Sequence, residues 1–231
     1  MTKIEPPLQH LGVIMDGNRR WAKSYGLKTI EGHQAGYRAL MDLLPAVQKL
    51  HIPYITFYAF STENWSRDKL EVKGIMKLLL WVINTKLNDF VGENIRIRLV
   101  GSPDNLPAEV LKALRSSEEA TAHCTGIMLG ICFNYGGQQE IVDAVKLLVA
   151  KGVEAQDMTV DMLEQCLYAA DMPPLDLVIR TSGERRLSGF MLWRAAYAEL
   201  YFTDVLWPDF DAEQLHIALT DYAQRGRRFG I

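Results

Sequence analysis

The chain has 231 residues, of which 48% are hydrophobic and 23% are charged, and its formal net charge is −3. This composition is typical of a globular protein with a sizeable core, and it excludes fibrous and disordered classes. The slightly acidic balance argues against binding of nucleic acid through overall charge, so we expect no nucleic-acid partner.

The cysteines Cys124, Cys132 and Cys166 are odd in number and show no C-x-x-C spacing. Neither a disulfide framework nor a structural zinc site is expected, and a reducing cytoplasm fits best. The N-terminus has no apolar signal-peptide core, and no apolar run approaches the ~18 residues of a membrane span. We therefore expect a cytoplasmic protein that is neither secreted nor integral to a membrane.

In the first half of the chain, apolar residues 11–15 predict a short buried strand that runs directly into the turn Asp16-Gly17-Asn18. Apolar spacing predicts a helix over 34–50, and aromatic and β-branched residues predict a strand over 54–60. Residues 71–90 predict a long helix that is apolar all the way round. Burial of this helix against a partner and lining of a hydrocarbon pocket both remain open.

The second half continues the alternation of strands and helices. Strands are predicted over 95–100, 127–133 and 175–179 and around 200–202, and helices over 108–122, 140–150, 162–169 and 212–222. The pattern predicts a single α/β domain over 1–231, with a mainly parallel central sheet flanked by helices. Ligands of such sheets bind beyond the carboxyl ends of the strands. No dinucleotide-binding or P-loop motif is present.

Polar segments follow the predicted strands that end near residues 15, 60, 133 and 179, and they would gather at one edge of the sheet. The side chains that could meet there are Asp16, Asn18, Arg19, Arg20, His33, Ser61, Asn64, Arg67, Arg180, Arg185, Arg186 and Ser188. Guanidinium groups pair bidentately with phosphate, and a carboxylate at a strand end can hold a divalent cation. The simpler alternatives are an ordinary turn with Asn18 as a helix N-cap, and arginines that are solvated surface charges.

Several motifs, in order along nearly the whole chain, resemble the signature regions of the cis-prenyltransferases, above all the bacterial undecaprenyl diphosphate synthases. They are His10, Met15-Asp16-Gly17-Asn18-Arg19-Arg20-Trp21-Ala22, Gly32-His33 with Gly36, Phe60-Ser61-Thr62-Glu63-Asn64-Trp65-Ser66-Arg67, Asn134-Tyr135-Gly136-Gly137, Arg180-Thr181-Ser182-Gly183-Glu184-Arg185-Arg186-Leu187-Ser188, and Leu192-Trp193 with Ala196-Tyr197-Ala198-Glu199 and Trp207-Pro208-Asp209-Phe210.

The resemblance implies a Mg²⁺-dependent homodimer that adds isopentenyl diphosphate to an allylic diphosphate, usually farnesyl diphosphate. The product would be a long Z-polyprenyl diphosphate, the undecaprenyl carrier for cell-wall glycan synthesis. An apolar tunnel would hold the growing chain, and the product would bring the enzyme into peripheral contact with the inner face of the membrane. A short-chain or branching synthase on the same fold and a non-catalytic partner subunit remain as alternatives.

The resemblance also implies roles for individual residues. Asp16 would be catalytic and would hold Mg²⁺ together with Glu199, and Asn64 would assist proton removal. The primer diphosphate would be bound by Gly17, Asn18, Arg19, Arg20 and His33, with Trp21 beside it. The isopentenyl diphosphate would be bound by Arg180, Arg186 and Ser188. The remaining substrate-binding residues would be Ser61, Thr62, Glu63, Trp65, Arg67 and Leu187.

The chain departs from the family pattern at several positions. Where the family usually has an arginine that contacts the primer diphosphate, this chain has Thr29, so primer affinity is open unless Lys28 compensates. Gln138 stands where arginine is common after Asn-Tyr-Gly-Gly, and Arg194 stands where glutamine often follows Leu-Trp. Gly130 and Cys132 lie in the strand expected near the tunnel, and all four positions could alter product length.

Overall fold

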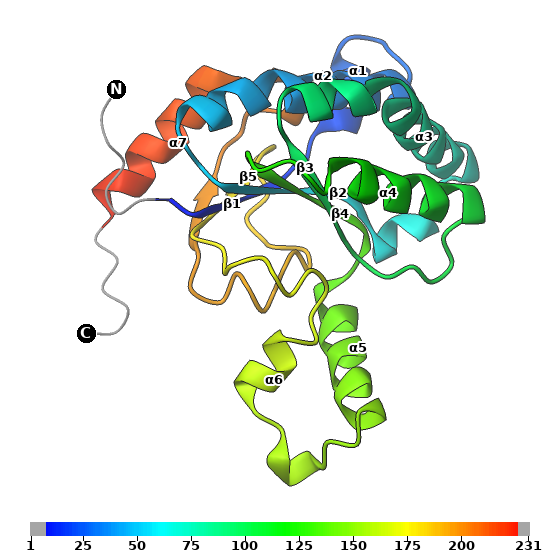
Figure 1. Cartoon of the computed structure of the whole chain (residues 1–231). Coiled ribbons are helices and arrows are strands. Elements are labelled where there is room, and N and C mark those ends of the chain that lie inside the picture. Colours follow the sequence, from blue (N-terminus) through cyan, green and yellow to red (C-terminus); the bar gives the residue numbers. More distant parts are fainter. Residues whose placement is uncertain (1–7, 226–231) are drawn as a thin grey trace.

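The computed structural model describes residues 8–225 as a single α/β domain built on one six-stranded sheet (Figure 1). The elements are β1 (His10–Ile14), α1 (Asn18–Ser24), α2 (Thr29–Lys49), β2 (Tyr54–Ser61), the 3₁₀-helix η1 (Thr62–Ser66), α3 (Lys69–Gly92), β3 (Arg96–Val100), α4 (Ala108–Thr121), β4 (Met128–Tyr135), α5 (Gly137–Ala150), η2 (Ala155–Asp157), α6 (Val160–Glu164), β5 (Leu177–Arg180), β6 (Glu199–Phe202), η3 (Trp207–Asp209) and α7 (Ala212–Gln224). The predicted domain bounds, 1–231, extend beyond the described residues at both ends.

The sheet has the order β3-β4-β2-β1-β5-β6, and every neighbouring pair is parallel. The α/β fold predicted from the sequence is therefore confirmed. β1 lies between β2 and β5, and Ile14 is in register with Arg180. Because the chain leaves β1 toward β2 and later returns to the other side of β1 with β5, a crevice is expected at the carboxyl end of β1.

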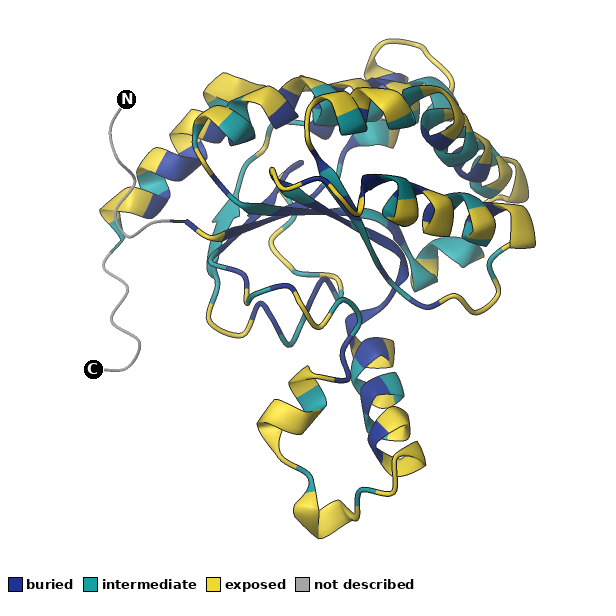
Figure 2. Cartoon of the chain, viewed as in Figure 1, coloured by how far each residue is buried: buried dark blue, intermediate teal, exposed yellow. Residues whose placement is uncertain are grey.

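The helices lie on both sides of the sheet (Figure 1): α2, α3 and α7 cover one face, and α5 and α6 extend from the other. Buried residues concentrate in the sheet and on the inward sides of the helices (Figure 2). Helix α4 lies beside the edge strand β3, where Thr121 Oγ1 accepts the Ile97 N–H at 3.0 Å and Glu118 Oε1 accepts the Leu99 N–H at 2.9 Å. These contacts protect an edge that would otherwise be open to pairing.

Helix α2 begins at Thr29, five residues before the predicted start at 34. Its first turn is capped, because the Glu31 carboxylate at the third helical position accepts the Lys28 N–H at 2.8 Å. Gly32 therefore lies inside the helix, as Gly36 does, rather than before it.

Helix α6 ends at Glu164, although the sequence pattern predicted a helix over 162–169. The Thr159 hydroxyl accepts the Met162 N–H at 3.2 Å and begins the helix earlier than predicted. Ala169 has a φ of 47°, which a right-handed helix does not allow. The predicted helix over 162–169 is therefore wrong in both bounds.

Helix α3 has the two apolar sides that its sequence indicated. Val82 and Phe90 pack in a core cluster with residues of α2 and the sheet, and Ile83 and Leu80 belong to a second cluster that includes Val110 and Leu114 of α4. Over residues 8–225, the structure contains no helix that combines the length and the apolar character needed to cross a bilayer.

Candidate active site

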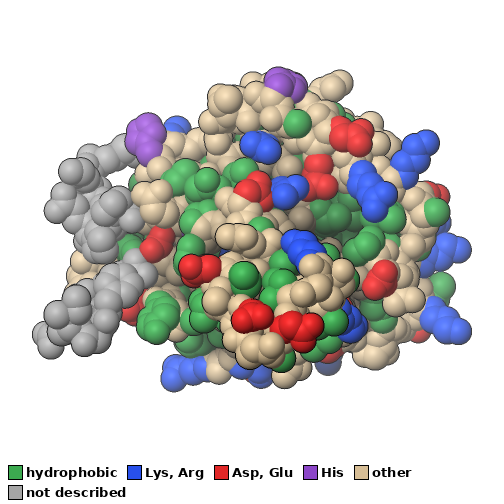
Figure 3. Space-filling model, turned by 60° about the horizontal axis from the view of Figure 1, so that its bottom comes forward, with side chains coloured by type: hydrophobic (Ala, Val, Ile, Leu, Met, Phe, Trp, Pro, Cys, Tyr) green, Lys and Arg blue, Asp and Glu red, His purple; other side chains and the backbone are tan. Residues whose placement is uncertain are grey.

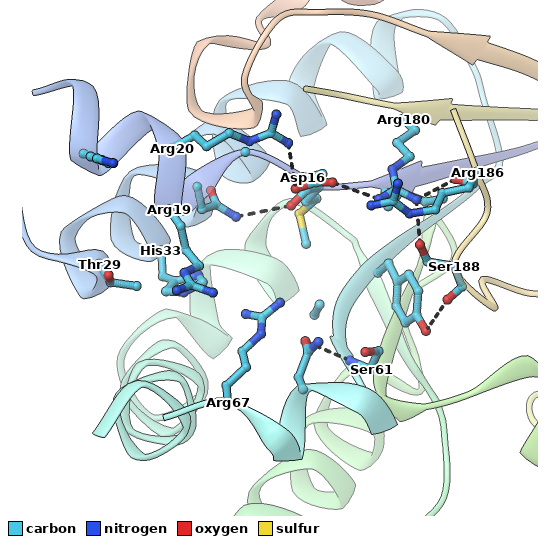
Figure 4. Close-up of a pocket in the computed structure, with 18 of the residues that line it drawn as sticks. Asp16, Arg19, Arg20, Thr29, His33, Ser61, Arg67, Arg180, Arg186 and Ser188 are labelled. Atoms are coloured by element: carbon cyan, nitrogen blue, oxygen red, sulfur yellow. Dashed lines mark hydrogen bonds and ion pairs between the residues drawn. The ribbon is translucent and has the colours of Figure 1, made fainter. Parts of the chain in front are cut away.

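A cleft of about 960 Å³ opens at the carboxyl ends of β1, β2 and β5. The face shown in Figure 3 is hollowed near its centre, with charged side chains around the hollow and hydrophobic ones inside it. The cleft brings together most of the predicted site: Asp16, Gly17, Asn18, Arg19, Arg20, His33, Ser61, Asn64, Arg67, Arg180, Arg186 and Ser188 (Figure 4).

Asp16 lies at the centre of this arrangement, just beyond β1. Its Oδ2 accepts from Arg180 Nη2 at 2.9 Å, and its Oδ1 lies 3.5 Å from Arg20 Nη2. Burial alone would raise the pKa of this carboxyl group, but the hydrogen bond and charge of Arg180, helped by Arg20, hold the pKa below its usual value. Asp16 is therefore ionised at neutral pH.

The loop that follows β5 is tied to the loop that follows β1. The Thr181 hydroxyl donates to Asp16 O at 2.6 Å, and Asp16 N donates back to Thr181 Oγ1 at 3.0 Å. Arg20 adds a contact from α1, donating to Ser182 O at 2.9 Å. Asp16 and Arg180 are thereby held by the backbone as well as by their own charges.

Arg180 organises one half of the cleft. Its side chain is 4% exposed, and Nη1 donates to Arg186 O at 2.6 Å and to Ser188 Oγ at 2.7 Å. Its Nε is buried and has no hydrogen-bond partner among the described residues. The Arg186 side chain is more exposed and pairs with Glu184. This half offers guanidinium and hydroxyl groups to an anion.

The other half of the cleft contains three cationic or ionisable side chains around Glu71. The Glu71 carboxylate lies 3.2 Å from His33 Nε2, 3.1 Å from Arg67 Nη1 and 3.8 Å from Arg19 Nε. Burial lowers the pKa of His33, although Glu71 acts in the opposite direction, so His33 is neutral at pH 7. The sequence analysis missed Glu71, and its only signal was its position four residues after Arg67.

Helix α1 lies unusually close to α2. A Cβ atom placed on Gly32 would lie 2.2 Å from Asn18 O, and one on Gly36 would lie 2.2 Å from Asn18 Oδ1. The α1 N-cap is Gly17, with a φ of 110°, so Asn18 is the first helical residue and not the cap. Asn18 Nδ2 donates to Met15 O at 3.3 Å, and the buried Oδ1 lacks a hydrogen-bond partner within residues 8–225.

Asn64 lies in η1, at the side of the cleft formed by β2. Its Oδ1 accepts the Ser61 N–H at 3.2 Å, which caps η1 and fixes the amide. Ser61, Asn64 and Arg67 therefore line the cleft together, as expected.

Some expected site residues do not line the cleft: Trp21, Thr62, Glu63, Trp65, Arg185, Leu187 and Glu199. Trp21 donates to Asp209 Oδ1 at 2.8 Å, and Trp65 donates to Asn134 Oδ1 at 2.7 Å. Both rings brace the surrounding loops.

Glu199, the second expected metal ligand, lies apart from Asp16 within the chain. Glu199 begins β6 and is in register with Leu177 at the start of β5, whereas Asp16 follows the end of β1. Because the strands are parallel, Glu199 lies at the amino ends of the strands and Asp16 lies at their carboxyl ends. Glu199 Oε2 instead accepts from Arg225 Nη1 at 3.0 Å.

The donor set around Asp16 fits a magnesium ion that is shared with a substrate. Among the described residues that line the cleft, Asp16 is the one carboxylate, and residues 8–225 contain no cluster of three His, Cys, Asp or Glu side chains. Mg²⁺ commonly binds through one or two carboxylates and the phosphates of the substrate, and it retains several waters. A preformed cage of protein ligands is therefore not needed.

An apolar cavity of about 140 Å³ adjoins the cleft, and both are lined by Met15, Asn18, His33 and Ala59. Its deeper walls are side chains of α2, α3 and β4, including Tyr37, Ile75, Leu79, Ile131 and Phe133. A cavity of roughly 150 Å³ accommodates a molecule of the size of benzene. The described conformation therefore has room for only part of a long hydrocarbon.

Strand β4, which contains Gly130 and Cys132, lines the apolar cavity, but through other residues. Strand side chains alternate between the two faces of a sheet, and Ile131 faces the cavity. Cys132 packs in the cluster on the other face, and a Cβ on Gly130 would meet Thr56 and Met172.

Known proteins resemble this chain over nearly its whole length. The family model described as "Putative undecaprenyl diphosphate synthase" matches residues 14–230. An isoprenyl transferase of Streptococcus mutans is 45% identical, over 96% of this chain and 92% of that protein. An isoprenyl transferase of Bacillus thuringiensis is 42% identical, over 96% and 88%.

Two solved structures share the fold. Lavandulyl diphosphate synthase from Lavandula x intermedia, in complex with dimethylallyl diphosphate, superposes with a TM-score of 0.93 at 33% identity, over 97% of this chain and 99% of that chain. A probable undecaprenyl diphosphate synthase from Campylobacter jejuni superposes with a TM-score of 0.83 at 31% identity, over the same shares.

Proposed function

This chain belongs to the undecaprenyl diphosphate synthase-like family of isoprenyl transferases, and on that premise we propose that it condenses isopentenyl diphosphate with an allylic diphosphate. Farnesyl diphosphate is the proposed primer, and the product is a Z-prenyl diphosphate. The main support is one cleft in which two groups of phosphate-binding side chains lie on either side of Asp16 and adjoin an apolar cavity.

The two halves of the cleft divide the substrates between them. Arg19, Arg20 and His33, with Gly17 and Asn18, bind the primer diphosphate, so its hydrocarbon enters the adjoining apolar cavity. Arg180, Arg186 and Ser188 bind the isopentenyl diphosphate on the opposite side of Asp16. Glu71 holds Arg19, His33 and Arg67 in place, because its carboxylate lies within 3.8 Å of all three side chains.

The chemistry requires stabilisation of a leaving diphosphate and protection of an allylic cation. Asp16 would hold Mg²⁺, which would supply charge stabilisation to the leaving diphosphate. Arg20 and Arg19 add fixed positive charge at the same place. The apolar walls of the cavity exclude water from the cation, and Asn64 assists removal of the proton that completes the new double bond.

The proposed product is a long polyprenyl diphosphate, the undecaprenyl carrier for cell-wall glycan synthesis. Similarity to the isoprenyl transferases of Streptococcus mutans and Bacillus thuringiensis supports this choice. The second candidate is a short-chain or branching synthase. It is supported by the apolar cavity of only about 140 Å³ and by the likeness to a synthase in complex with dimethylallyl diphosphate, a short allylic diphosphate.

The proposed assembly is a homodimer in the cytoplasm that contacts the inner face of the membrane through its product. Exposed apolar side chains on the arm formed by α5 and α6 support a partner there: Val142, Leu147, Val149, Val160 and Met162. Such side chains are more often covered than solvated when they gather on a projecting element.

The deciding experiment incubates the purified protein with Mg²⁺, farnesyl diphosphate and labelled isopentenyl diphosphate, and measures product length by mass spectrometry. Products near C55 support the undecaprenyl assignment, and products that stop at C20, one isopentenyl unit beyond the C15 primer, support the short-chain candidate. An absence of incorporation would overturn the proposal and favour a non-catalytic partner subunit.

A further inference from the structure

A buried ion pair lies behind the cleft and has no place in the proposed chemistry. Arg194 Nη1 lies 3.1 Å from Glu140 Oε1, and the side chains are 5% and 0% exposed. Burial of two charges is costly unless their remaining donors and acceptors are also satisfied. Arg194 is also the residue at which this chain departs from the glutamine that often follows Leu-Trp.

The pair is embedded in a nearly complete hydrogen-bond network. Arg194 Nη2 donates to Tyr168 O at 2.8 Å and to Ala169 O at 2.9 Å. Glu140 Oε2 accepts from the Tyr135 hydroxyl at 2.5 Å, and Oε1 accepts the Tyr168 N–H at 3.1 Å. The pair therefore joins α5, the end of β4, the segment near residue 168 and the segment that follows Ser188.

The segment that the pair holds contains a turn with unfavourable backbone angles. Ser188, Gly189 and Met191 have φ values of 49°, 78° and 39°. Positive φ is uncommon for residues other than glycine, and it persists where surrounding contacts enforce it. The Ser188 in this turn is the residue whose hydroxyl accepts from Arg180 at 2.7 Å.

The turn is attached to α5 at two points. Gly137 N donates to Gly189 O at 2.9 Å at the first residue of α5, and the Glu140–Arg194 pair joins the same two segments a few residues later. The Tyr58 hydroxyl adds a link, at 3.2 Å from Ser188 O and 3.3 Å from Tyr135 O. Loss of the pair would remove one of the two attachments to α5.

We propose that Glu140 and Arg194 are positioning residues for the isopentenyl diphosphate half of the cleft. The pair keeps the turn over 188–191 in its strained conformation, so that Ser188 Oγ and Arg186 O remain hydrogen-bonded to Arg180. This inference rests on the proposed function for the identity of the ligand. The primer half is built from α1, α2, η1 and α3, so the pair acts on one substrate and not on the other.

The test compares the Michaelis constants of the two substrates in Arg194→Gln. We expect KM for isopentenyl diphosphate to rise roughly tenfold, as is usual when a supporting residue is removed, and KM for farnesyl diphosphate to stay within about twofold. Arg98→Gln is the matched control, because Arg98 also forms ion pairs, with Glu118 and Asp171, but at the sheet edge. It should change neither KM.

A second variant separates positioning from stability. Arg194→Gln leaves Glu140 buried without its cation, which can unfold the protein, so Glu140→Gln/Arg194→Gln removes both charges. We expect this double variant to melt close to the wild-type temperature and still to show the raised KM for isopentenyl diphosphate. Arg194→Lys, which keeps the charge but loses the planar fork, should give an intermediate KM.

A third comparison tests whether Arg194 acts through Ser188. If it does, Arg194→Gln should add little to the rise in KM caused by Ser188→Ala, because both changes remove the same interaction. Unchanged KM for isopentenyl diphosphate in folded variants, or equal rises for both substrates, would overturn the inference. Wild-type protein that forms no product would instead contradict the proposed function.

Discussion

Arg180 Nη2 donates to Asp16 Oδ2 at 2.9 Å across two neighbouring parallel strands, and the arginine is 4% exposed while the carboxylate is 31% exposed. A buried guanidinium thus faces a carboxylate that remains open to the cleft. The other terminal nitrogen of Arg180, Nη1, donates to Ser188 Oγ. The two halves of the cleft therefore share one ion pair.

Asp16→Asn should abolish condensation without unfolding the protein. The amide keeps the shape of the side chain but loses the charge needed for Mg²⁺, and we expect kcat to fall roughly 100-fold or more. Steady-state turnover and the melting temperature are the measurements. Asp209→Asn, which alters the acceptor of Trp21 outside the cleft, serves as the control. Normal turnover in Asp16→Asn would contradict the assigned role.

Thr29→Arg should improve primer binding. Thr29 lines the cleft at the first residue of α2, where an arginine side chain could reach the primer diphosphate. We expect KM for farnesyl diphosphate to fall, while Thr29→Gln, which adds length without charge, leaves it unchanged. If Thr29→Arg also leaves it unchanged, the missing arginine has no consequence in this chain.

Removal of metal should stop catalysis but leave the fold intact. Asp16 is the one carboxylate among the described cleft residues, so the free protein has little with which to hold Mg²⁺. Addition of EDTA should eliminate turnover and leave the melting temperature of the substrate-free protein unchanged. A drop of several degrees would show that a metal stabilises the fold.

Thr181→Val should loosen the connection between the loops after β1 and β5. The buried Thr181 hydroxyl donates to Asp16 O and accepts from Asp16 N, and valine can form neither hydrogen bond. We expect a loss of about 1–3 kcal/mol in the free energy of unfolding and a raised KM for both diphosphates. Thr85→Val, which removes an exposed bond to Trp81 O, should have a much smaller effect on stability. Equal losses would contradict this account.

Stability should fall as the pH is lowered, in part because of His10. Its Nδ1 donates to Pro173 O at 2.8 Å and its Nε2 lies 2.8 Å from Thr56 Oγ1. Burial lowers its pKa from 6.5 to about 4. In the unfolded chain His10 is protonated below about pH 6.5, whereas in the folded chain it is protonated only below about pH 4. Between these two pH values protonation favours the unfolded chain, so the free energy of unfolding falls progressively as the pH is lowered.

The size of this effect is about 3 kcal/mol across the full window. His10→Gln should flatten the decline in the free energy of unfolding, measured in urea between pH 7.5 and pH 4.5. His216→Gln, at an exposed position on α7, should leave the slope as in the wild type. Parallel curves for wild type and His10→Gln would contradict the assignment.

The sequence predicted the location of the cleft because apolar strands followed directly by polar turns are readable from residue types alone. Asp16 and Arg180 could be expected at one edge once the strands were taken as parallel. Glu71 was missed because an arginine and a glutamate four residues apart are usually a surface pair on a helix. Only the fold brings His33 and Arg19 to the same carboxylate.

The position of Glu199 relative to Asp16 within the chain could not be predicted for a related reason. A sequence motif gives the order of residues but not the end of the strand at which each residue lies, and Glu199 begins its strand rather than following it. The start of α2 was misjudged because glycines usually interrupt helices. Here the space they leave is filled by Asn18.

The two glycines of α2 also determine how the cleft holds its arginines. Helix α1 spans only Asn18–Ser24, which is too short to keep a helical conformation by itself. It packs on α2 where the Asn18 backbone lies against Gly32 and the Asn18 side chain lies against Gly36. The positions of Arg19 and Arg20, the next residues of α1, therefore depend on this packing. A methyl group added at Gly32 would collide with the backbone of α1, and one added at Gly36 would collide with the Asn18 side chain. The placement of positive charge at the mouth of the cleft therefore depends on the absence of a side chain at two positions of α2.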